Sequence, residues 1–446
     1  MDLRTRISEL MPQARAELAE LVSIPSVFDP RQFPVEECTR AADWVRAAFA
    51  AVGFEDARLE ETPDGSMAVV GSRPGPDPAA PTVLLYSHYD VQPPLDDAAW
   101  RTPPFELTEV DGRWYGRGAA DCKGNIVSHL AALRALGDDV PVNLKLVVEG
   151  SEELGDGGLE RYVPEHADLL RADAILVCDT GNAAVGQPAI TASLRGLVEM
   201  VVRVDALPSE LHSGVFGGAA PDALAALIAM LASLRDAAGD TTVAGLPHDE
   251  VWDGAPYDEA AFRSDAGIGD EESLLGSGSV SDMLWARPAL TVVGIDCPPV
   301  VGSSASITPT ASARLNLRIP PGTDPDQAER ALTDHLRAAA PWGVSVECTT
   351  EFTGAPFRAR TDGPAYRTMR AAMSQAYGRD PVLLGQGGSI PLCNVFEETY
   401  PDAEQVLMGV EEPQTLIHAP NESVDPTEIE RMALVLALFL QDYAGS

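Results

Sequence analysis

Two histidines and several acidic residues stand at positions where a folded sheet can gather them into one site. Most of them follow an apolar run of the kind that forms a buried strand. The set consists of His88, Asp90, Asp121, Glu152, Glu153, Asp179 and His418. His88 and Asp90 are two residues apart after the apolar run 82–87, and side chains at this spacing on a strand point the same way. In α/β proteins, ligands bind at the carboxyl ends of such strands.

Imidazole and carboxylate groups together are the ligands of hydrolytic sites that hold two divalent cations such as Zn²⁺, Mn²⁺ or Co²⁺. Three carboxylates and a bridging hydroxide would balance the four positive charges, which leaves one glutamate to act as a base. Without cations, so many neighbouring acids would repel one another and take up protons. Each residue alone indicates little, because a strand-end histidine is usually structural and adjacent glutamates are usually solvated. Only their joint placement predicts a dinuclear metal site.

The surrounding sequence alternates strands with helices up to about residue 190. Runs typical of strands occur at 66–71, 82–87, 143–148 and 174–178. Apolar residues at helical spacing indicate helices at 7–22, 37–52 and 125–136. We therefore predict an α/β fold with a mostly parallel sheet flanked by helices.

A second pattern begins near Thr191. Strands with one exposed face are indicated at 196–204, 311–319 and 344–352, and helices at 220–234 and 324–339. This pattern predicts an inserted α+β domain. The expected organisation is a catalytic domain in two parts, 1–190 and 356–446, with the inserted domain at 191–355. The acidic, glycine-rich stretch 247–275 is expected to be an irregular surface loop, and the chain is expected to end in a helix at 428–443.

Five segments resemble, in the same order, the metal motifs of the M20 family of metallopeptidases, and within it the carnosinase-like branch of cytosolic dipeptidases. The segments are Tyr86-Ser87-His88-Tyr89-Asp90-Val91-Gln92-Pro93, Gly116-Arg117-Gly118-Ala119-Ala120-Asp121, Glu149-Gly150-Ser151-Glu152-Glu153, and the surroundings of Asp179 and of His418. They extend over nearly the whole chain, so the resemblance is specific.

The resemblance implies a role for each metal-site residue. Asp121 would bridge two divalent ions. His88 and Asp179 would complete the ligands of one ion, and Glu153 and His418 those of the other. Zn²⁺ is the expected ion, with Mn²⁺ or Co²⁺ as alternatives.

Two further acids have implied roles beside the ions. Asp90 would hydrogen-bond a ligand histidine and fix its orientation. Glu152 would be the general base that takes a proton from the attacking water and passes it to the leaving amine. The implied activity is the hydrolysis of dipeptides or short peptides through a metal-bridged hydroxide.

The resemblance extends to substrate binding. His212 would reach in trans across a homodimer interface and stabilise the oxyanion. Arg318 would bind the carboxylate of the substrate, a task that suits a planar guanidinium group. Gly388 and Ser389 belong to a loop that would line the same pocket. The inserted domain would therefore be a lid and dimerisation domain.

Two positions depart from the family pattern. Cys122 stands where relatives usually carry an acid, and Gly385-Gln386 replaces a common Arg-Glu pair. The lost charge leaves the substrate preference open, and an N-acyl-amino-acid deacylase with the same metal site is the alternative. A metal-free binding protein is disfavoured by the complete ligand set. A serine hydrolase is disfavoured because Gly276-Ser277-Gly278-Ser279 is not at a strand-to-helix elbow.

The composition excludes several classes of partner. The 446 residues include 31 basic and 68 acidic side chains, a net charge of −37, which argues against nucleic acids and anionic membranes. The longest apolar run, 432–440, is too short to span a bilayer, and the first residues lack the apolar core of a secretion signal. Six cysteines without a C-x-x-C spacing are expected to be free thiols in the cytoplasm.

Overall fold

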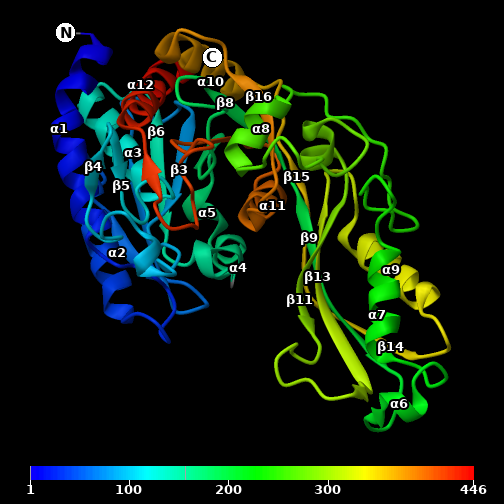
Figure 1. Ribbon diagram of the computed structural model, residues 1–446. Coiled ribbons are helices and arrows are strands. Elements are labelled where there is room, and N and C mark those ends of the chain that lie inside the picture. The colour runs from blue at the N-terminus through cyan, green and yellow to red at the C-terminus, as the bar shows by residue number, and fades with distance from the viewer. Residues whose placement is uncertain (1, 156, 446) are drawn as a thin grey trace. The chain divides into compact units, whose positions relative to one another are not determined.

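The computed structural model describes residues 2–155 and 157–445 (Figure 1). Contacts within the chain divide it into two compact units. Unit 1 comprises Met1–Ala192, Ala359–Leu384 and Pro391–Ser446, and unit 2 comprises Ser193–Arg358 and Gly385–Ile390. Each unit is therefore assembled from segments that are distant in the sequence.

The largest sheet has nine strands in the order β1-β2-β6-β3-β7-β17-β8-β15, with β16 beside β8. The strands are β1 (Arg58–Glu61), β2 (Met67–Arg73), β3 (Thr82–His88), β6 (Asn143–Glu149), β7 (Ala174–Cys178), β8 (Ala189–Leu194), β15 (Phe357–Arg358), β16 (Val382–Gln386) and β17 (Glu404–Met408). β6, β3, β7 and β17 run parallel, whereas β2 and β8 pair with this group in the antiparallel sense. The carboxyl ends of four adjacent strands thus lie at one edge of the sheet.

Helices cover both faces of the parallel strands, which explains why these strands are mostly apolar. In β3, Val83 and Leu85 belong to the same buried core as α1, α3, α10 and α12. The next side chain, Tyr86, points to the other face, where its ring packs edge-on against Phe396 of α11. The helices of unit 1 are α1 (Leu3–Val22), α2 (Val35–Ala50), α3 (Lys123–Leu136), α4 (Gly158–Glu165), α5 (Ala167–Leu170), α10 (Pro364–Tyr377), α11 (Pro391–Thr399) and α12 (Pro426–Tyr443).

A small three-stranded sheet joins two distant parts of unit 1. It consists of β4 (Thr108–Val110), β5 (Arg113–Tyr115) and β18 (Ser423–Val424), and β18 pairs antiparallel with β5. The pairing places the segment before β18 beside the glycine-rich turn that follows β5, where the backbone amide of Gly116 donates to the carbonyl oxygen of Glu422 (3.0 Å).

Unit 2 contains a four-stranded antiparallel sheet in the order β11-β13-β9-β14. On β13 alternate residues such as Leu315 and Leu317 are buried while Arg314 is exposed, as expected for a sheet with one covered face. Helices α7 and α9 pack on that face and share its core. The larger elements are β9 (Gly196–Asp205), β11 (Ala289–Asp296), β13 (Thr310–Ile319), β14 (Ser345–Gly354), α7 (Ala223–Ala232) and α9 (Pro325–Ala339). The shorter ones are β10 (Leu211–His212), α6 (Ser213–Phe216) and β12 (Ser306–Ile307).

The predicted α/β class, with a mostly parallel sheet flanked by helices, is confirmed. The expectation of an irregular loop at 247–275 is wrong in part, because α8 (Glu259–Ala266) forms there. Asp258 caps this helix by accepting a hydrogen bond from the amide of Ala261 (3.0 Å), a local signal that the acidic composition concealed. Among the described residues, no helix is long and apolar enough to cross a membrane.

Candidate metal centre

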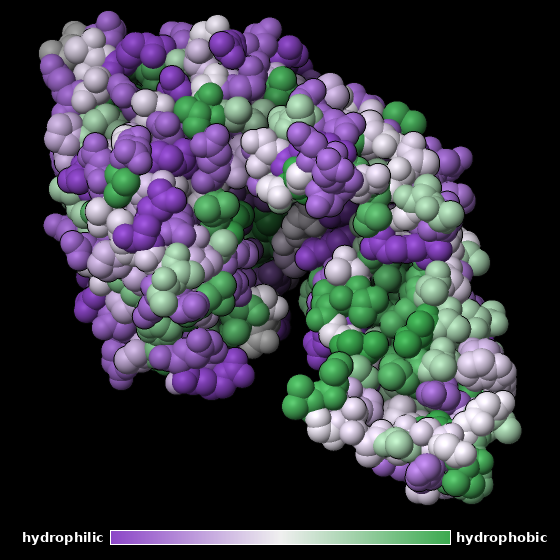
Figure 2. Space-filling model, in the orientation of Figure 1, coloured by the Kyte–Doolittle hydropathy of each residue, from purple (hydrophilic) through white to green (hydrophobic). Residues whose placement is uncertain are grey.

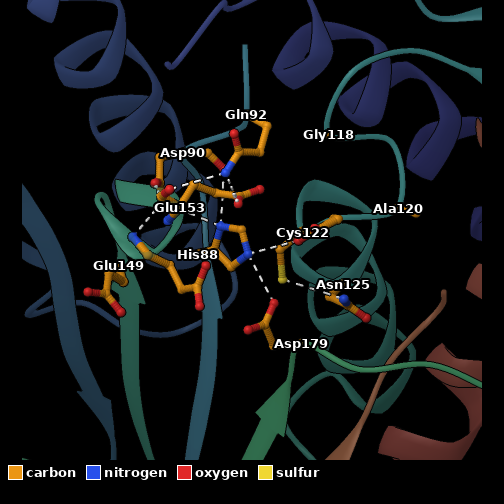
Figure 3. A network of polar contacts seen from close by, with 12 residues as sticks. His88, Asp90, Gln92, Gly118, Ala120, Cys122, Asn125, Glu149, Glu153 and Asp179 are labelled. Carbon is orange, nitrogen blue, oxygen red and sulfur yellow. Dashed lines mark hydrogen bonds and ion pairs between the residues drawn. The ribbon is translucent and has the colours of Figure 1, made fainter. Parts of the chain in front are cut away.

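Two residues of the site lie at the carboxyl ends of two neighbouring parallel strands. His88 is the last residue of β3, and Asp179 directly follows β7. Nε2 of the fully buried His88 lies 3.0 Å from Oδ1 of Asp179 (Figure 3). The same nitrogen lies 3.0 Å from Oδ1 of Asp121. The sheet therefore brings together residues that are 91 positions apart in the sequence.

The carboxylate of Asp121 lies between the two histidines. Its Oδ1 is 3.0 Å from His88 Nε2, and its Oδ2 is 3.0 Å from Nε2 of His418. The same His418 nitrogen is 3.1 Å from Oε2 of Glu153. Zinc bonds of about 2.0–2.1 Å at tetrahedral angles would separate neighbouring ligand atoms by about 3.3 Å. The donor atoms thus lie close enough together to bind divalent cations, and the carboxylate of Asp121 lies between the two histidines.

Asp90 holds both a histidine and the turn that carries the two glutamates. Its Oδ1 and Oδ2 accept hydrogen bonds from the backbone amides of Glu152 (3.2 Å) and Glu153 (3.0 Å). Nδ1 of His88 lies 3.1 Å from the Asp90 carbonyl oxygen and 3.4 Å from its Oδ1. If Nδ1 donates its proton here, Nε2 is left free as a ligand atom.

Burial and mutual repulsion shift the pKa values of the acids. Burial, followed by repulsion from Asp179, raises the pKa of Glu152 well above its usual range. Burial and the charge of Asp121 raise the pKa of Glu153 to about 7. Burial alone would raise the pKa of Asp121 as well, but hydrogen bonds from His418 and His88 hold it below its usual range. Divalent cations among these groups would oppose the upward shifts.

Hydrogen bonds to Asp121 and Glu153 raise the pKa of His418 to about 11. For His88, burial acts to lower the pKa, but the charge of Asp179 and the hydrogen bonds to Asp121 and Asp179 raise it well above its usual range. Both imidazoles would therefore have to lose a proton before they could bind a cation.

Cys122, one of the departures from the family pattern, is fully buried in this region. Its thiol donates to the carbonyl oxygen of Cys178 (2.9 Å) and accepts from Nδ2 of Asn125 (3.4 Å). Burial raises the pKa of Cys122 to about 12. The thiol is thus held in its neutral form although it lies near His88 and Asp179.

Three residues that lie at this centre have no role assigned from the sequence. Gln92 donates from Nε2 to Oε2 of Glu153 (2.8 Å), and Glu422 binds the turn around Asp121. Both stand inside or beside the recognised motifs. Glu411 groups with Asp121 and Asp179, with ligand atoms within 4.8 Å of one another. Glu411 comes three residues after β17, so the strand-end rule could have found it once that strand was located.

The predicted substrate residues all belong to unit 2. Nη1 of Arg318 lies 3.3 Å from Oγ of Ser389, and that hydroxyl donates to the carbonyl oxygen of Arg195. Nε and Nη1 of Arg195 are buried without a hydrogen-bond partner in residues 2–155 and 157–445. Burial and the nearby Arg318 lower the pKa of Arg195 to about 10. At Gly388 an added Cβ would meet no atom within 4 Å, so packing alone does not require glycine there.

His212 does not join this cluster within one chain. It ends β10 and pairs with Ser306, whereas Arg318 is near the far end of β13. The eight residue steps from Thr310 to Arg318 correspond to about 27 Å of extended strand. The exposed imidazole accepts a hydrogen bond at Nδ1 from the amide of Gly214 (3.1 Å).

Imidazole and carboxylate donors that converge at the carboxyl edge of a parallel sheet define a metal-dependent enzyme of the α/β class. The model of Peptidase family M20/M25/M40 matches residues 84–442, and the chain belongs to this family. The chain is 42% identical over 442 residues to the cysteinylglycine-S-conjugate dipeptidase of Corynebacterium striatum, with 97% of each protein covered.

Two further comparisons agree with this assignment. The chain is 30% identical over 462 residues to the Beta-Ala-His dipeptidase of Rattus norvegicus, covering 97% of this chain and 89% of that one. The crystal structure of human carnosine dipeptidase 1 matches with a TM-score of 0.83 at 26% identity, covering 100% of this chain and 98% of that one. The predicted resemblance to M20 dipeptidases is confirmed, and the deacylase alternative is not favoured.

Proposed function

We propose that this M20-family metallopeptidase hydrolyses dipeptides at a centre of two divalent cations. The observation that carries the proposal is the carboxylate of Asp121, whose two oxygens face His88 and His418 at 3.0 Å each. A carboxylate placed in this way can bridge two ions. The family and the relatives named above support a peptide as the substrate.

The proposed ligands divide into two sets around Asp121. His88 and Asp179 hold one ion, and Glu153 and His418 hold the other. Zn²⁺ is the proposed ion, with Mn²⁺ and Co²⁺ as alternatives that bind similar donors. When bound, such cations polarise the scissile carbonyl and make water a stronger acid.

Glu152 is the proposed general base. It comes three residues after the carboxyl end of β6, and Asp90 fixes its backbone by accepting a hydrogen bond from the Glu152 amide. Its raised pKa suits a group that must take a proton from water and later give it to the leaving amine. Asp90 is the proposed positioning residue for both His88 and Glu152.

Unit 2 is proposed to bind the carboxylate of the substrate. Arg318 and Ser389 form its polar wall, with the backbone of Gly388 beside them. Arg195 adds a second guanidinium group with two buried nitrogens that lack a partner among the described residues. An anionic group would satisfy these donors and relieve the repulsion between the two arginines.

We also propose that the enzyme is a cytoplasmic homodimer in which residues 191–355 form the lid and dimerisation domain and His212 acts in trans on the oxyanion. The separation of His212 from Arg318 along β13 supports a role outside its own substrate cluster. β11 is an edge strand of unit 2, and exposed apolar residues gather on this unit (Figure 2). They include Val292, Val293, Ile295, Val300 and Val301. Such a patch is typical of a protein interface.

The test uses the purified chain loaded with each of the three metals and a panel of dipeptides and N-acyl amino acids. We expect release of free amino acids from the dipeptides. Glu152→Gln is expected to keep its metal content and to lose about 10²–10⁴ in rate, because only the base is removed. The exposed Glu398→Gln is the control for the change in charge. Near-normal turnover by Glu152→Gln, or a preference for N-acyl amino acids, would contradict the proposal.

A further inference from the structure

Glu411 is a buried acid beside the metal centre that neither the family motifs nor the proposed reaction uses. It is 5% exposed, and its Oε1 is buried without a hydrogen-bond partner within the described part of the chain. Its ligand atom and those of Asp121 and Asp179 all lie within 4.8 Å of one another. A buried carboxylate oxygen with no donor is costly unless a cation approaches it.

The backbone holds Glu411 in this place. The segment after β17 runs beside the segment after β7, with a parallel bridge between Gly181 and Glu411. The amide of Asn182 donates to the carbonyl oxygen of Glu411 (2.8 Å). A Cβ added at Gly181 would lie 2.7 Å from the Cβ of Glu411, so only glycine permits this close approach. The side chain is therefore kept at the carboxyl edge of the sheet, on the Asp179 side.

The neighbouring acid shows what Glu411 lacks. Glu412 is also buried, but its carboxylate forms an ion pair with Arg113 and accepts a hydrogen bond from the amide of Gln414 (2.8 Å). For Glu411 the structure records no arginine or lysine partner among the described residues; the positively charged groups that act on it are the imidazoles of His88 and His418. The nearby acids Asp121 and Asp179 repel it.

We propose that Glu411 is a sixth protein ligand of the centre and binds the ion held by His88, Asp121 and Asp179. This inference rests on the proposed two-ion function. The site would have three carboxylates and one imidazole, whereas the site of Glu153 and His418 has two carboxylates and one imidazole. The additional oxygen favours an ion of higher coordination number, so the first site should accept Mn²⁺ better relative to Zn²⁺ than the second.

Cys122 is the competing donor at this site, since its sulfur groups with His88 and Asp179. Its hydrogen bonds to the carbonyl of Cys178 and from Asn125 already satisfy the thiol. Glu411 Oε1 has no such partners in the described residues. The unpartnered carboxylate is therefore the better candidate for the additional ligand.

The test is a calorimetric titration of the full chain, stripped of metal, with Mn²⁺ and separately with Zn²⁺. Loss of residues that merely support a ligand typically lowers metal affinity by about 10–100-fold, so loss of a direct ligand in Glu411→Gln should weaken one Mn²⁺ site at least about tenfold. The second site should be unchanged, and Zn²⁺ should be affected less. Glu398→Gln, an exposed acid of α11, is the charge-matched control.

The variants separate the competing explanations. Glutamine has the shape and hydrogen-bonding groups of a protonated glutamic acid. If Glu411 stayed protonated and bound no ion, Glu411→Gln would leave the Mn²⁺ affinity unchanged, and this result would overturn the proposal. Glu411→Asp retains the charge but shortens the reach, and it should weaken the same single site; should Glu411→Gln not fold, unchanged binding by Glu411→Asp would overturn the proposal. A wild-type chain that binds two ions, with no difference in the variants, would refute this inference alone. A wild-type chain that binds no ion would refute the proposed function.

Discussion

Glu422 connects the two segments that carry Asp121 and His418. Its Oε2 accepts from Nη1 of Arg117 (2.7 Å) and from the amide of Gly118 (2.9 Å). Its Oε1 accepts from the amides of Ala120 and Asp121 (3.1 Å each). The side chains of Arg117 and Glu422 are each only 1% exposed. We predict that Glu422→Gln destabilises unit 1 and weakens metal binding.

The expected loss of stability in Glu422→Gln follows from the number of hydrogen-bond donors that would lose their acceptor. A glutamine replaces one oxygen with an NH₂ group, which would face either two backbone amides or Arg117 and one amide. Burial raises the pKa of Glu422 despite Arg117, so the intact pair is not itself a large net gain. The cost arises because the buried Arg117 loses its charged partner in either orientation, and the neutral carbonyl oxygens of Pro93 (3.1 Å) and Ala419 (3.3 Å) replace that charge only in part. Removing one partner of a buried ion pair typically lowers the free energy of unfolding by about 3–5 kcal/mol. Because Arg117 keeps these remaining contacts, we expect a loss of about 3 kcal/mol.

The assay has two parts. Hydrogen exchange measured by mass spectrometry should show faster exchange at the amides of Gly118, Ala120 and Asp121 in Glu422→Gln. Calorimetry should show metal affinity about 10–100-fold lower, because Glu422 supports the ligand turn without binding an ion. Glu398→Gln again controls for the lost charge. Arg117→Met combined with Glu422→Gln should recover part of the stability, since no unpaired charge remains.

A loss of less than about 1 kcal/mol in the stability of Glu422→Gln, with wild-type hydrogen exchange, would contradict this role of Glu422, because a buried pair cannot lose its carboxylate at so small a cost. A loss of stability without any loss of metal affinity would show that the turn around Asp121 is held by other contacts. In that case Glu422 would not be a positioning residue of the centre.

Three further outcomes can be measured. Asp121→Ala should lose both ions, and two-metal stoichiometry by elemental analysis would contradict its bridging role. Metal affinity should fall as the pH falls, because the raised pKa values of Glu153 (about 7) and His418 (about 11) mean that protons compete with the ion for both groups. Calorimetry in buffers of different ionisation heat counts the protons that metal binding releases, and a count that does not fall between about pH 7 and about pH 8 would be incompatible. Mixing His212→Ala with Glu152→Gln subunits should restore activity if His212 acts in trans, and an inactive verified heterodimer would exclude this.

The sequence is most informative where strands are buried on both faces. The run 82–87 has few alternatives to a buried strand, because most of its side chains are apolar and the proline- and glycine-rich segment 74–81 precedes it. Once this strand and the strand at 174–178 are placed in one sheet, their carboxyl ends meet. The positions of His88 and Asp179 then follow from topology without any knowledge of side-chain contacts.

Two elements that the sequence did not indicate, β11 and α8, have side chains that mostly face solvent. β11 was not foreseen because its apolar residues Val292, Val293 and Ile295 are exposed and do not alternate, and its register shifts between Val292 and Gly294. α8 was concealed by its acidic composition. Glu411 was missed for a different reason: β17, the strand that it follows, was not located in the sequence, and the bridge between Glu411 and Gly181 joins distant segments.

The charge balance of the centre changes when Glu411 is counted. From the sequence, three carboxylates and a hydroxide neutralise two divalent cations, and one glutamate remains. With Glu411 as a ligand, four carboxylates would neutralise the cations before any water enters. The cations would then withdraw less charge from water, and more of the work of removing its proton would rest on Glu152. An additional ligand would thereby explain why a centre so rich in acids needs a separate base.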